Sequence, residues 1–198
     1  MLDRFVPSLK RRWNRVVDAG TGLFVTRVNL CCGSDIKPGW VNLDLHPVSA
    51  KVRRFNLTNE SDLQWLSTLN ADRIEMHHAI SYLNIAQAVA VLNACHASLV
   101  QGGELVLEFP DLQKLAAKLA TVGEDNLDEY LELVRAIYAY DVEDAYDPGF
   151  DKQTYVFGWS GPILTRFLLQ AGFATVRTLR PEKHGPRPWR DTRLVATR

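Results

Sequence analysis

The chain has 198 residues, of which 46% are apolar and 23% are charged, and its formal net charge at pH 7 is zero. That length fits one domain with a full hydrophobic core, and the balanced charge argues against a general affinity for nucleic acid. The three cysteines lack the spacing of a zinc site, and a bridge between adjacent Cys31 and Cys32 would close almost no loop. We therefore expect a reduced, cytoplasmic protein without a metal site.

The first twenty residues carry apolar side chains at helical spacing with basic side chains between them. The apolar positions are Leu2, Phe5, Val6, Leu9, Trp13, Val16 and Val17, and the basic ones are Arg4, Lys10, Arg11, Arg12 and Arg15. The pattern predicts an amphipathic helix over residues 1–20. This helix either caps the core or rests through residues 2–17 on an anionic membrane surface or a partner. We expect no membrane span and no signal peptide.

Apolar runs and helical patterns alternate along the rest of the chain, as expected for a parallel sheet covered by helices. Strands are predicted at 26–31, 40–44, 51–56, 72–77, 103–109, 173–179 and 192–197. Helices are predicted at 60–69, 84–100, 111–121, 126–141 and 160–171. Residues 142–158 are rich in Asp, Tyr and Gly, and we interpret them as a long loop that closes over a ligand at the carboxyl ends of the strands.

The first two predicted strands flank the small-residue turn Cys31-Cys32-Gly33, and the second strand ends in Asp44. Such a turn lets the backbone approach a ligand, and a carboxylate at the next strand end can hold a ribose diol. About eight residues separate the two strands, too few for a crossover helix, which needs roughly a dozen. We therefore expect a turn there and a nucleotide site with one open wall.

Several motifs occur in a consistent order along residues 26–197. They are Val28-Asn29-Leu30-Cys31-Cys32-Gly33, Pro38-Gly39-Trp40, Asn42-Leu43-Asp44, the segment Asp72 to Leu83, Gln101-Gly102-Gly103, Pro110-Asp111-Leu112, Ala171-Gly172-Phe173 and Arg190-Asp191. Together they resemble the class I S-adenosylmethionine-dependent methyltransferases, and most closely a small bacterial group of that family. The resemblance implies an α/β fold with a doubly wound, seven-stranded, mainly parallel sheet whose last strand is antiparallel. It also implies one domain over residues 21–198 with an insert at about 112–158.

The resemblance further implies that S-adenosylmethionine is the cofactor and that a methyl group is moved to a small acceptor, with a sugar hydroxyl in polysaccharide synthesis as the suggested class. The cofactor-binding positions that carry over are Asn29, Cys31, Cys32, Gly33, Asp44, Asn56, Leu57 and His77. The turn at 31–33 would hold the methionine part and Asp44 the ribose. Asn56 and Leu57 would face adenine, with the Asn56 carbonyl oxygen accepting from the exocyclic amine.

Two histidines are candidates for the general base that takes the acceptor proton. His78 follows the fourth predicted strand, and His184 lies in a basic loop at 183–191 that also holds Trp189. Histidine suits this role because it titrates near neutral pH, although either side chain could instead satisfy backbone groups. The arginines of the basic loop could bind an anionic or sugar substrate. Aromatic side chains that could stack on sugar or pack in the core are Tyr138, Tyr140, Tyr146, Tyr155, Phe157 and Trp159.

Three departures from the family pattern keep other functions open. Cys31 stands where the family has glycine, Asn56 stands for an acid, and Ile80-Ser81-Tyr82 replaces Leu-Glu-His. These changes suit a non-catalytic module that keeps the fold and has lost turnover. A dinucleotide oxidoreductase is the third hypothesis, and the missing Gly-x-Gly-x-x-Gly spacing argues against it.

Overall fold

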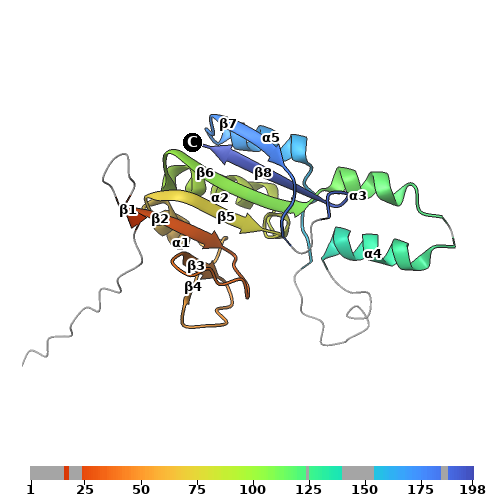
Figure 1. Cartoon of the computed structure of the whole chain (residues 1–198), viewed down its shortest axis with the longest axis horizontal. Helices are drawn as coiled ribbons and strands as arrows, with labels where there is room; N and C mark the ends of the chain where they lie inside the picture. The colour runs from red at the N-terminus through yellow and green to blue at the C-terminus, as the bar shows by residue number, and fades with distance from the viewer. Residues whose placement is uncertain (1–15, 18–23, 124, 140–153, 184–186) are drawn as a thin grey trace, which may run out of the picture.

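The computed structural model describes residues 16–17, 24–123, 125–139, 154–183 and 187–198. Five strands run parallel: β2 (Phe24–Leu30), β3 (Val41–Asp44), β4 (Val52–Arg54), β5 (Ala71–His77) and β6 (Leu99–Pro110). They are joined by β7 (Thr175–Leu179) and β8 (Asp191–Thr197), and the strand order is β4-β3-β2-β5-β6-β8-β7 (Figure 1). β8 is antiparallel to both of its neighbours. The predicted seven-stranded, mainly parallel sheet with an antiparallel last strand is therefore confirmed.

Three helices, α1 (Glu60–Ser67), α2 (Ile85–Ser98) and α5 (Gly161–Gln170), lie behind the sheet in Figure 1. The chemistry of their first residues explains where two of them start. Asn84 and Gln87 form a reciprocal capping box at α2, and the Asn59 side chain accepts from the Asp62 N–H at α1. These helices bury their apolar sides against one face of the sheet. Central members of this core are Val28, Leu30, Ile74, Met76, Leu105, Leu107, Leu164, Leu168 and Leu194.

The predicted insert at 112–158 begins with two helices, α3 (Leu112–Leu119) and α4 (Leu127–Tyr138), which lie beyond the strand ends (Figure 1). They pack on each other through a small separate cluster centred on Leu115, Leu133 and Ala136. Asp111 starts α3 by accepting from the backbone N–H groups of Gln113 and Lys114. The part of the insert at 140–153, and with it most of the predicted closing loop, lies outside the described residues.

The helix predicted over residues 1–20 lies outside the described residues except at Val16 and Val17. These two residues form the short strand β1 (Val16–Val17), which pairs antiparallel with β2. The predicted helix therefore does not extend to this end of its range. Within the described part of the chain, no helix combines the length and apolarity that crossing a bilayer requires.

The connection from β2 to β3 contains turns and no helix, as its length predicted. Two buried asparagine side chains stabilise this connection through hydrogen bonds. The Asn29 amide donates to the Asp35 carbonyl at 2.6 Å and to the Asn42 side chain at 3.0 Å, and Asn42 in turn bonds both backbone groups of Lys37. Asn29 and Asn42 are almost fully buried, so these bonds replace the water that both amides lose.

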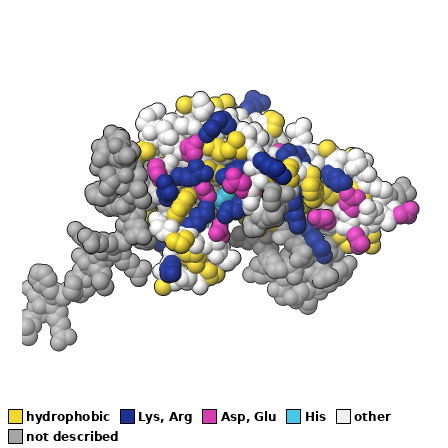
Figure 2. Space-filling view, viewed as in Figure 1, with side chains coloured by type: hydrophobic (Ala, Val, Ile, Leu, Met, Phe, Trp, Pro, Cys, Tyr) yellow, Lys and Arg dark blue, Asp and Glu magenta, His cyan; other side chains and the backbone are white. Residues whose placement is uncertain are grey.

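Charged side chains occupy the face of the sheet that is turned toward the viewer, where no helix of the described residues lies (Figures 1 and 2). Strand alternation puts them there: Arg73, Glu75 and His77 on β5 point away from the core that Ile74 and Met76 enter. Ion pairs connect them across the strands in the series Lys37, Glu75, Arg73, Glu104 and Arg177, which we call the charged ladder. Parallel strands usually bury both faces, and this sheet buries one apolar face and pairs charges on the other.

Glu75 is the most buried member of the charged ladder, with a relative exposure of 7%. Burial alone would raise the pKa of its carboxyl. Hydrogen bonds from His77, Lys37 and Arg73 outweigh that effect and hold the pKa far below its ordinary value. Glu75 therefore stays ionised, and two cations, Arg73 on β5 and Lys37 in the β2–β3 connection, pair with it.

We expect Glu75→Gln to lower the free energy of unfolding by about 2 kcal/mol at pH 7, because it leaves cations without their counter-charge. A carboxyl whose pKa is depressed by folding contributes its stability above the pKa of the unfolded chain, about 4.3, and loses it as the pH falls toward the folded value. The difference between the two proteins should therefore shrink between pH 7 and pH 3. Urea unfolding at both pH values measures it. Glu60→Gln, on the exposed start of α1, is the control, and an equal difference at both pH values would contradict the assignment.

Candidate functional site

A cavity of about 820 Å³ lies at the carboxyl ends of the parallel strands. Open α/β sheets bind ligands at this edge, where the strand order reverses direction. Seven of the predicted site residues line it, namely Cys31, Gly33, Asp44, Asn56, Leu57, His77 and His78. We call this space the cofactor cavity, after the ligand that the resemblance leads us to expect there. Two predicted positions do not line it: Asn29 holds the β2–β3 connection, and Cys32 is buried with its thiol against the Gly33 carbonyl.

Asp44 connects the two loops that border the cofactor cavity. One carboxylate oxygen accepts from the Gly33 N–H at 2.8 Å, and the other accepts from the His46 N–H at 2.9 Å. A carboxylate oxygen has room for a further donor, so both oxygens can also accept the hydroxyl hydrogens of a diol. The two backbone bonds fix where these oxygens point, which is what a selective diol site requires.

The turn that follows β2 uses left-handed backbone conformations at Cys31 and Gly33, with φ of 56° and 50°. A side chain at Gly33 would meet no atom within 4 Å, so glycine serves the conformation there and leaves open space beside it. Cys31 adopts the same conformation without that freedom, which costs about 1–2 kcal/mol for a residue with a Cβ. Burial, and then the Asp44 carboxylate, raise the pKa of the Cys31 thiol, so it stays protonated and is a poor nucleophile.

Asn56 and Leu57 follow β4 and line the cofactor cavity, as predicted. The Asn56 carbonyl oxygen, which the prediction assigned to the adenine amine, has partners within the chain. It accepts from both the N–H and the hydroxyl of Thr58, each at 2.9 Å. The amide nitrogen is the group that can serve a ligand, and it is a donor, suited to a ring nitrogen of adenine rather than to an amine.

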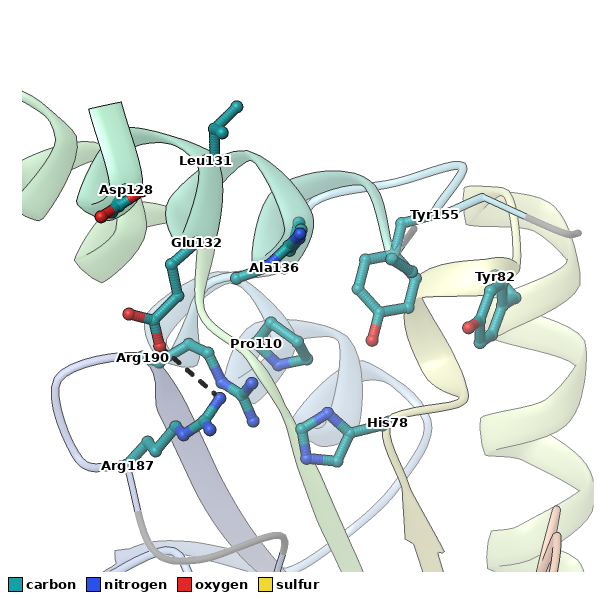
Figure 3. A pocket seen from close by; sticks show the side chains of 12 residues that line it. His78, Tyr82, Pro110, Asp128, Leu131, Glu132, Ala136, Tyr155, Arg187 and Arg190 are labelled. Atoms are coloured by element: carbon teal, nitrogen blue, oxygen red, sulfur yellow. Dashed lines mark ion pairs between the residues drawn. The ribbon is translucent and has the colours of Figure 1, made fainter. Parts of the chain in front are cut away.

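A second cavity of about 790 Å³ adjoins the first and lies under α4 (Figure 3). Its lining comes from distant segments and consists of His78, Tyr82, Pro110, Asp128, Leu131, Glu132, Arg135, Ala136, Ala139, Tyr155, Arg187 and Arg190. We call it the acceptor cavity, after the second reactant that the resemblance leads us to expect. His78 and Tyr82 line both cavities and so form the wall that the two spaces share.

Two tyrosines give the acceptor cavity an aromatic side. The ring centroids of Tyr82 and Tyr155 are 4.8 Å apart with an interplanar angle of 59°. Burial raises the pKa of both phenols, so both stay neutral hydrogen-bonding groups. Phe157 and Trp159, which also seemed able to stack on sugar, belong to the core instead: Trp159 is fully buried and its indole N–H donates to the Ile80 carbonyl.

His78 directly follows β5 and has a left-handed backbone with φ of 54°. Its backbone N–H donates to the backbone carbonyl of Glu108 at 2.7 Å. Its ring atom Nε2 lies 3.9 Å from a carboxylate oxygen of Asp191. The structure thus places this predicted base between the two cavities. The other predicted base, His184, lies outside the described residues, but Arg187 and Arg190 of the same loop line the acceptor cavity.

Sequence reasoning missed Tyr82 and the residues that α4 contributes to the acceptor cavity. Tyr82 was noted only as part of a departure from the family motif. It reaches the site because the short 3-10 helix η1 (Ile80–Tyr82) buries Ile80 and Ser81 and leaves the tyrosine at the cavity. On α4, Glu132 and Arg135 are ordinary surface charges by pattern, and only the packing of α3 on α4 brings them there.

The sheet order and the position of the cofactor cavity can now be compared with known structures. A methyltransferase from Archaeoglobus fulgidus that depends on S-adenosylmethionine superimposes with a TM-score of 0.53 at 14% identity, over 88% of this chain and 86% of that one. An S-adenosylmethionine-dependent methyltransferase from Methanosarcina mazei superimposes with a TM-score of 0.53 at 11% identity, over 87% of this chain and 92% of that one. The fold is that of the S-adenosylmethionine-dependent methyltransferases.

An O-methyltransferase family protein from Burkholderia thailandensis also matches, with a TM-score of 0.50 and 14% identity over 88% of this chain. The chain spans about half of that protein, since the match covers 51% of its length. No protein-family model and no curated protein matches the sequence. At these identities the comparisons establish the fold, and the site residues have to be argued from their own geometry.

The left-handed backbone at Cys31 predicts how substitutions there change the free energy of unfolding. Cys31→Gly should stay within about 1 kcal/mol of the wild type, because the relief of backbone strain offsets the added freedom of the unfolded chain. Cys31→Val should lower the free energy of unfolding by about 2 kcal/mol, since a β-branched residue tolerates positive φ poorly. Urea unfolding of the three proteins tests this. Equal stability of the glycine and valine variants would show that the turn adopts another conformation in solution.

Proposed function

We propose that the protein transfers the methyl group of S-adenosylmethionine to a hydroxyl group of a small acceptor of the saccharide class. The observation that carries this proposal is the pair of adjoining cavities that share the His78 and Tyr82 wall. A group transfer needs both reactants side by side with a proton acceptor at their meeting point. One cavity has a diol-binding carboxylate, the other has aromatic and charged groups, and an imidazole stands between them.

The lining of the cofactor cavity fits S-adenosylmethionine in its chemistry. The fixed Asp44 carboxylate would hold the two ribose hydroxyls, and Leu57 together with the Asn56 amide would face adenine. The open space beside Gly33 would take the methionine part, where the backbone can approach closely. The bound cofactor supplies an activated methyl group on a positively charged sulfur.

The chain's own residues then have two tasks, positioning and proton transfer. Tyr82 and Tyr155 would hold a sugar ring by stacking, and the charged groups of the acceptor cavity would bond its hydroxyls. His78 would take the proton of the acceptor hydroxyl as that oxygen receives the methyl group, which keeps the acceptor oxygen neutral at the end of the transfer.

A non-catalytic binding module remains the second candidate, because Cys31 places a side chain where the family has glycine. The two functions differ in turnover and share cofactor binding. Binding and rate therefore have to be measured separately.

Binding is tested with S-adenosylhomocysteine, the demethylated product. Asp44→Ala should weaken its binding about 5- to 150-fold, which corresponds to the roughly 1–3 kcal/mol of a hydrogen bond to a charged group. Asp72→Ala is the matched control. That carboxylate lies at the amino end of β5, away from the cofactor cavity, and pairs with Arg27. Isothermal calorimetry measures both variants, with NAD as the competing ligand class. Binding of NAD in preference to S-adenosylhomocysteine, or no heat with either, would overturn the methyltransferase proposal.

Turnover is tested by following S-adenosylhomocysteine formation with neutral monosaccharides, hexuronic acids and phenols as acceptors. His78→Asn should lower the rate about 100-fold or more, the usual contribution of a general base, and asparagine tolerates the left-handed backbone. The affinity for S-adenosylhomocysteine should change little. Tight cofactor binding without methyl transfer to any acceptor would favour the binding module.

A further inference from the structure

Asp191 is a buried carboxylate that faces the shared wall of the two cavities. It begins β8, its side chain has no exposed surface, and one of its oxygens lies 3.9 Å from Nε2 of His78. The guanidinium of Arg190 holds it with two bonds, from Nε at 2.8 Å and from Nη2 at 2.7 Å. A planar guanidinium and a carboxylate joined by two bonds have a fixed mutual orientation. Asp191 is therefore fixed in place before any ligand binds.

Glu108 is a second buried carboxylate beside the same imidazole. Its oxygens accept from the backbone N–H groups of Glu182 and Lys183 at 2.9 and 2.8 Å, and Arg193 lies 3.7 Å away. Ligand atoms of His78, Glu108 and Asp191 all lie within 4.8 Å of one another, a spacing that a metal ion could use. Arg190 pairs with Asp191, and Arg193 lies between Glu108 and Glu182, so guanidinium groups already stand where a divalent cation would have to bind. The arrangement instead places one imidazole in the field of two oriented carboxylates.

The backbone also limits how His78 can sit. Its left-handed φ of 54° is costly for a residue with a Cβ, and the bond of 2.7 Å from its N–H to the Glu108 carbonyl holds it there. Figure 3 shows the imidazole below Pro110, with Arg190 on one side and Tyr155 above. The two ring nitrogens of an imidazole face different directions, so a ring with Nε2 toward Asp191 presents Nδ1 elsewhere.

We infer that Asp191, held by Arg190, is a positioning residue that fixes the imidazole of His78 and stabilises its protonated form while the acceptor loses its proton. This inference rests on the proposed function. In the step, the proton of the acceptor hydroxyl moves to Nδ1, and the positive charge on the ring is balanced by the carboxylate near Nε2. The distance of 3.9 Å exceeds that of a hydrogen bond, so Asp191 acts through its charge.

Other charged and titratable groups lie beside His78 or line one of the two cavities with it. In addition to Asp191 they are Glu108 on β6, Arg193 on β8, Arg187 and Arg190 before β8, His77 on β5, Tyr82 on η1, Asp128, Glu132 and Arg135 on α4, and Tyr155. Among the described residues, Asp191 is the acid whose ion-pair contact with His78 is within 4.0 Å. Changing its charge should therefore alter the titration of His78, and changing the charge of Arg190 should alter it in the opposite sense.

The experiment is an NMR titration of the histidine ring signals in the full chain, without ligand and with S-adenosylhomocysteine, the His78 signal being assigned with His78→Asn. Asp191→Asn removes a negative charge and should move the His78 titration to lower pH by about one pH unit. Arg190→Gln removes the compensating positive charge and should move it to higher pH. Two shifts of opposite sign would not follow from a purely structural role, which affects stability alone.

Asp111→Asn is the matched control, because this buried carboxylate serves the start of α3, Gly161 and Thr192. This variant should lower the free energy of unfolding and leave the pH at which His78 titrates unchanged. An unchanged titration in folded Asp191→Asn, or a shift to lower pH in Arg190→Gln, would overturn the inference. If Asp191→Asn does not fold, Arg190→Gln alone decides. Absence of S-adenosylhomocysteine binding would overturn the proposed function separately, because the titration is also recorded without ligand.

Discussion

The apolar core on one side of the sheet is the constraint on which the rest of the structure depends. The strands bury alternate side chains against α1, α2 and α5, and this fixes the register of each strand. Once Ile74 and Met76 enter the core, Glu75 and His77 must point to the opposite face. The same register brings the ends of β2, β3, β4 and β5 to one edge, where the cofactor cavity lies. The charged ladder and the cavity therefore have a common cause in the packing of that core.

The buried carboxylates near the shared wall have bonding partners within the chain, although the wall lies between two cavities. Asp191 has Arg190, and Glu108 has two backbone N–H groups and Arg193. Buried charges are retained only when such partners replace the lost water. If His78 accepts a proton as we propose, the ring charge enters a field whose carboxylates are already held in place, which is electrostatic preorganisation.

The elements could be predicted from the sequence because each has a local cause. The strand and helix periods placed them within a few residues, and the position of Asp44 followed from a strand end after a small-residue turn. Asn29 was assigned to the cofactor through the family resemblance, and its amide instead closes the β2–β3 connection. At Asn56 the pattern did not indicate that the Thr58 hydroxyl donates to the carbonyl oxygen assigned to adenine. The acceptor cavity could not be predicted, because η1, α4 and the β7–β8 connection meet there only through packing.

The position of β8 between β6 and β7 also has a consequence for how the molecule folds. β8 follows the other strands in sequence, yet it completes the hydrogen bonds of two of them. Until it inserts, the long strand β6 has an open edge and β7 has no described partner, and such edges are where chains associate wrongly. Pairings distant in sequence also form slowly. Since β8 carries Asp191, the edge of the sheet is protected and the shared wall is completed in the same late event.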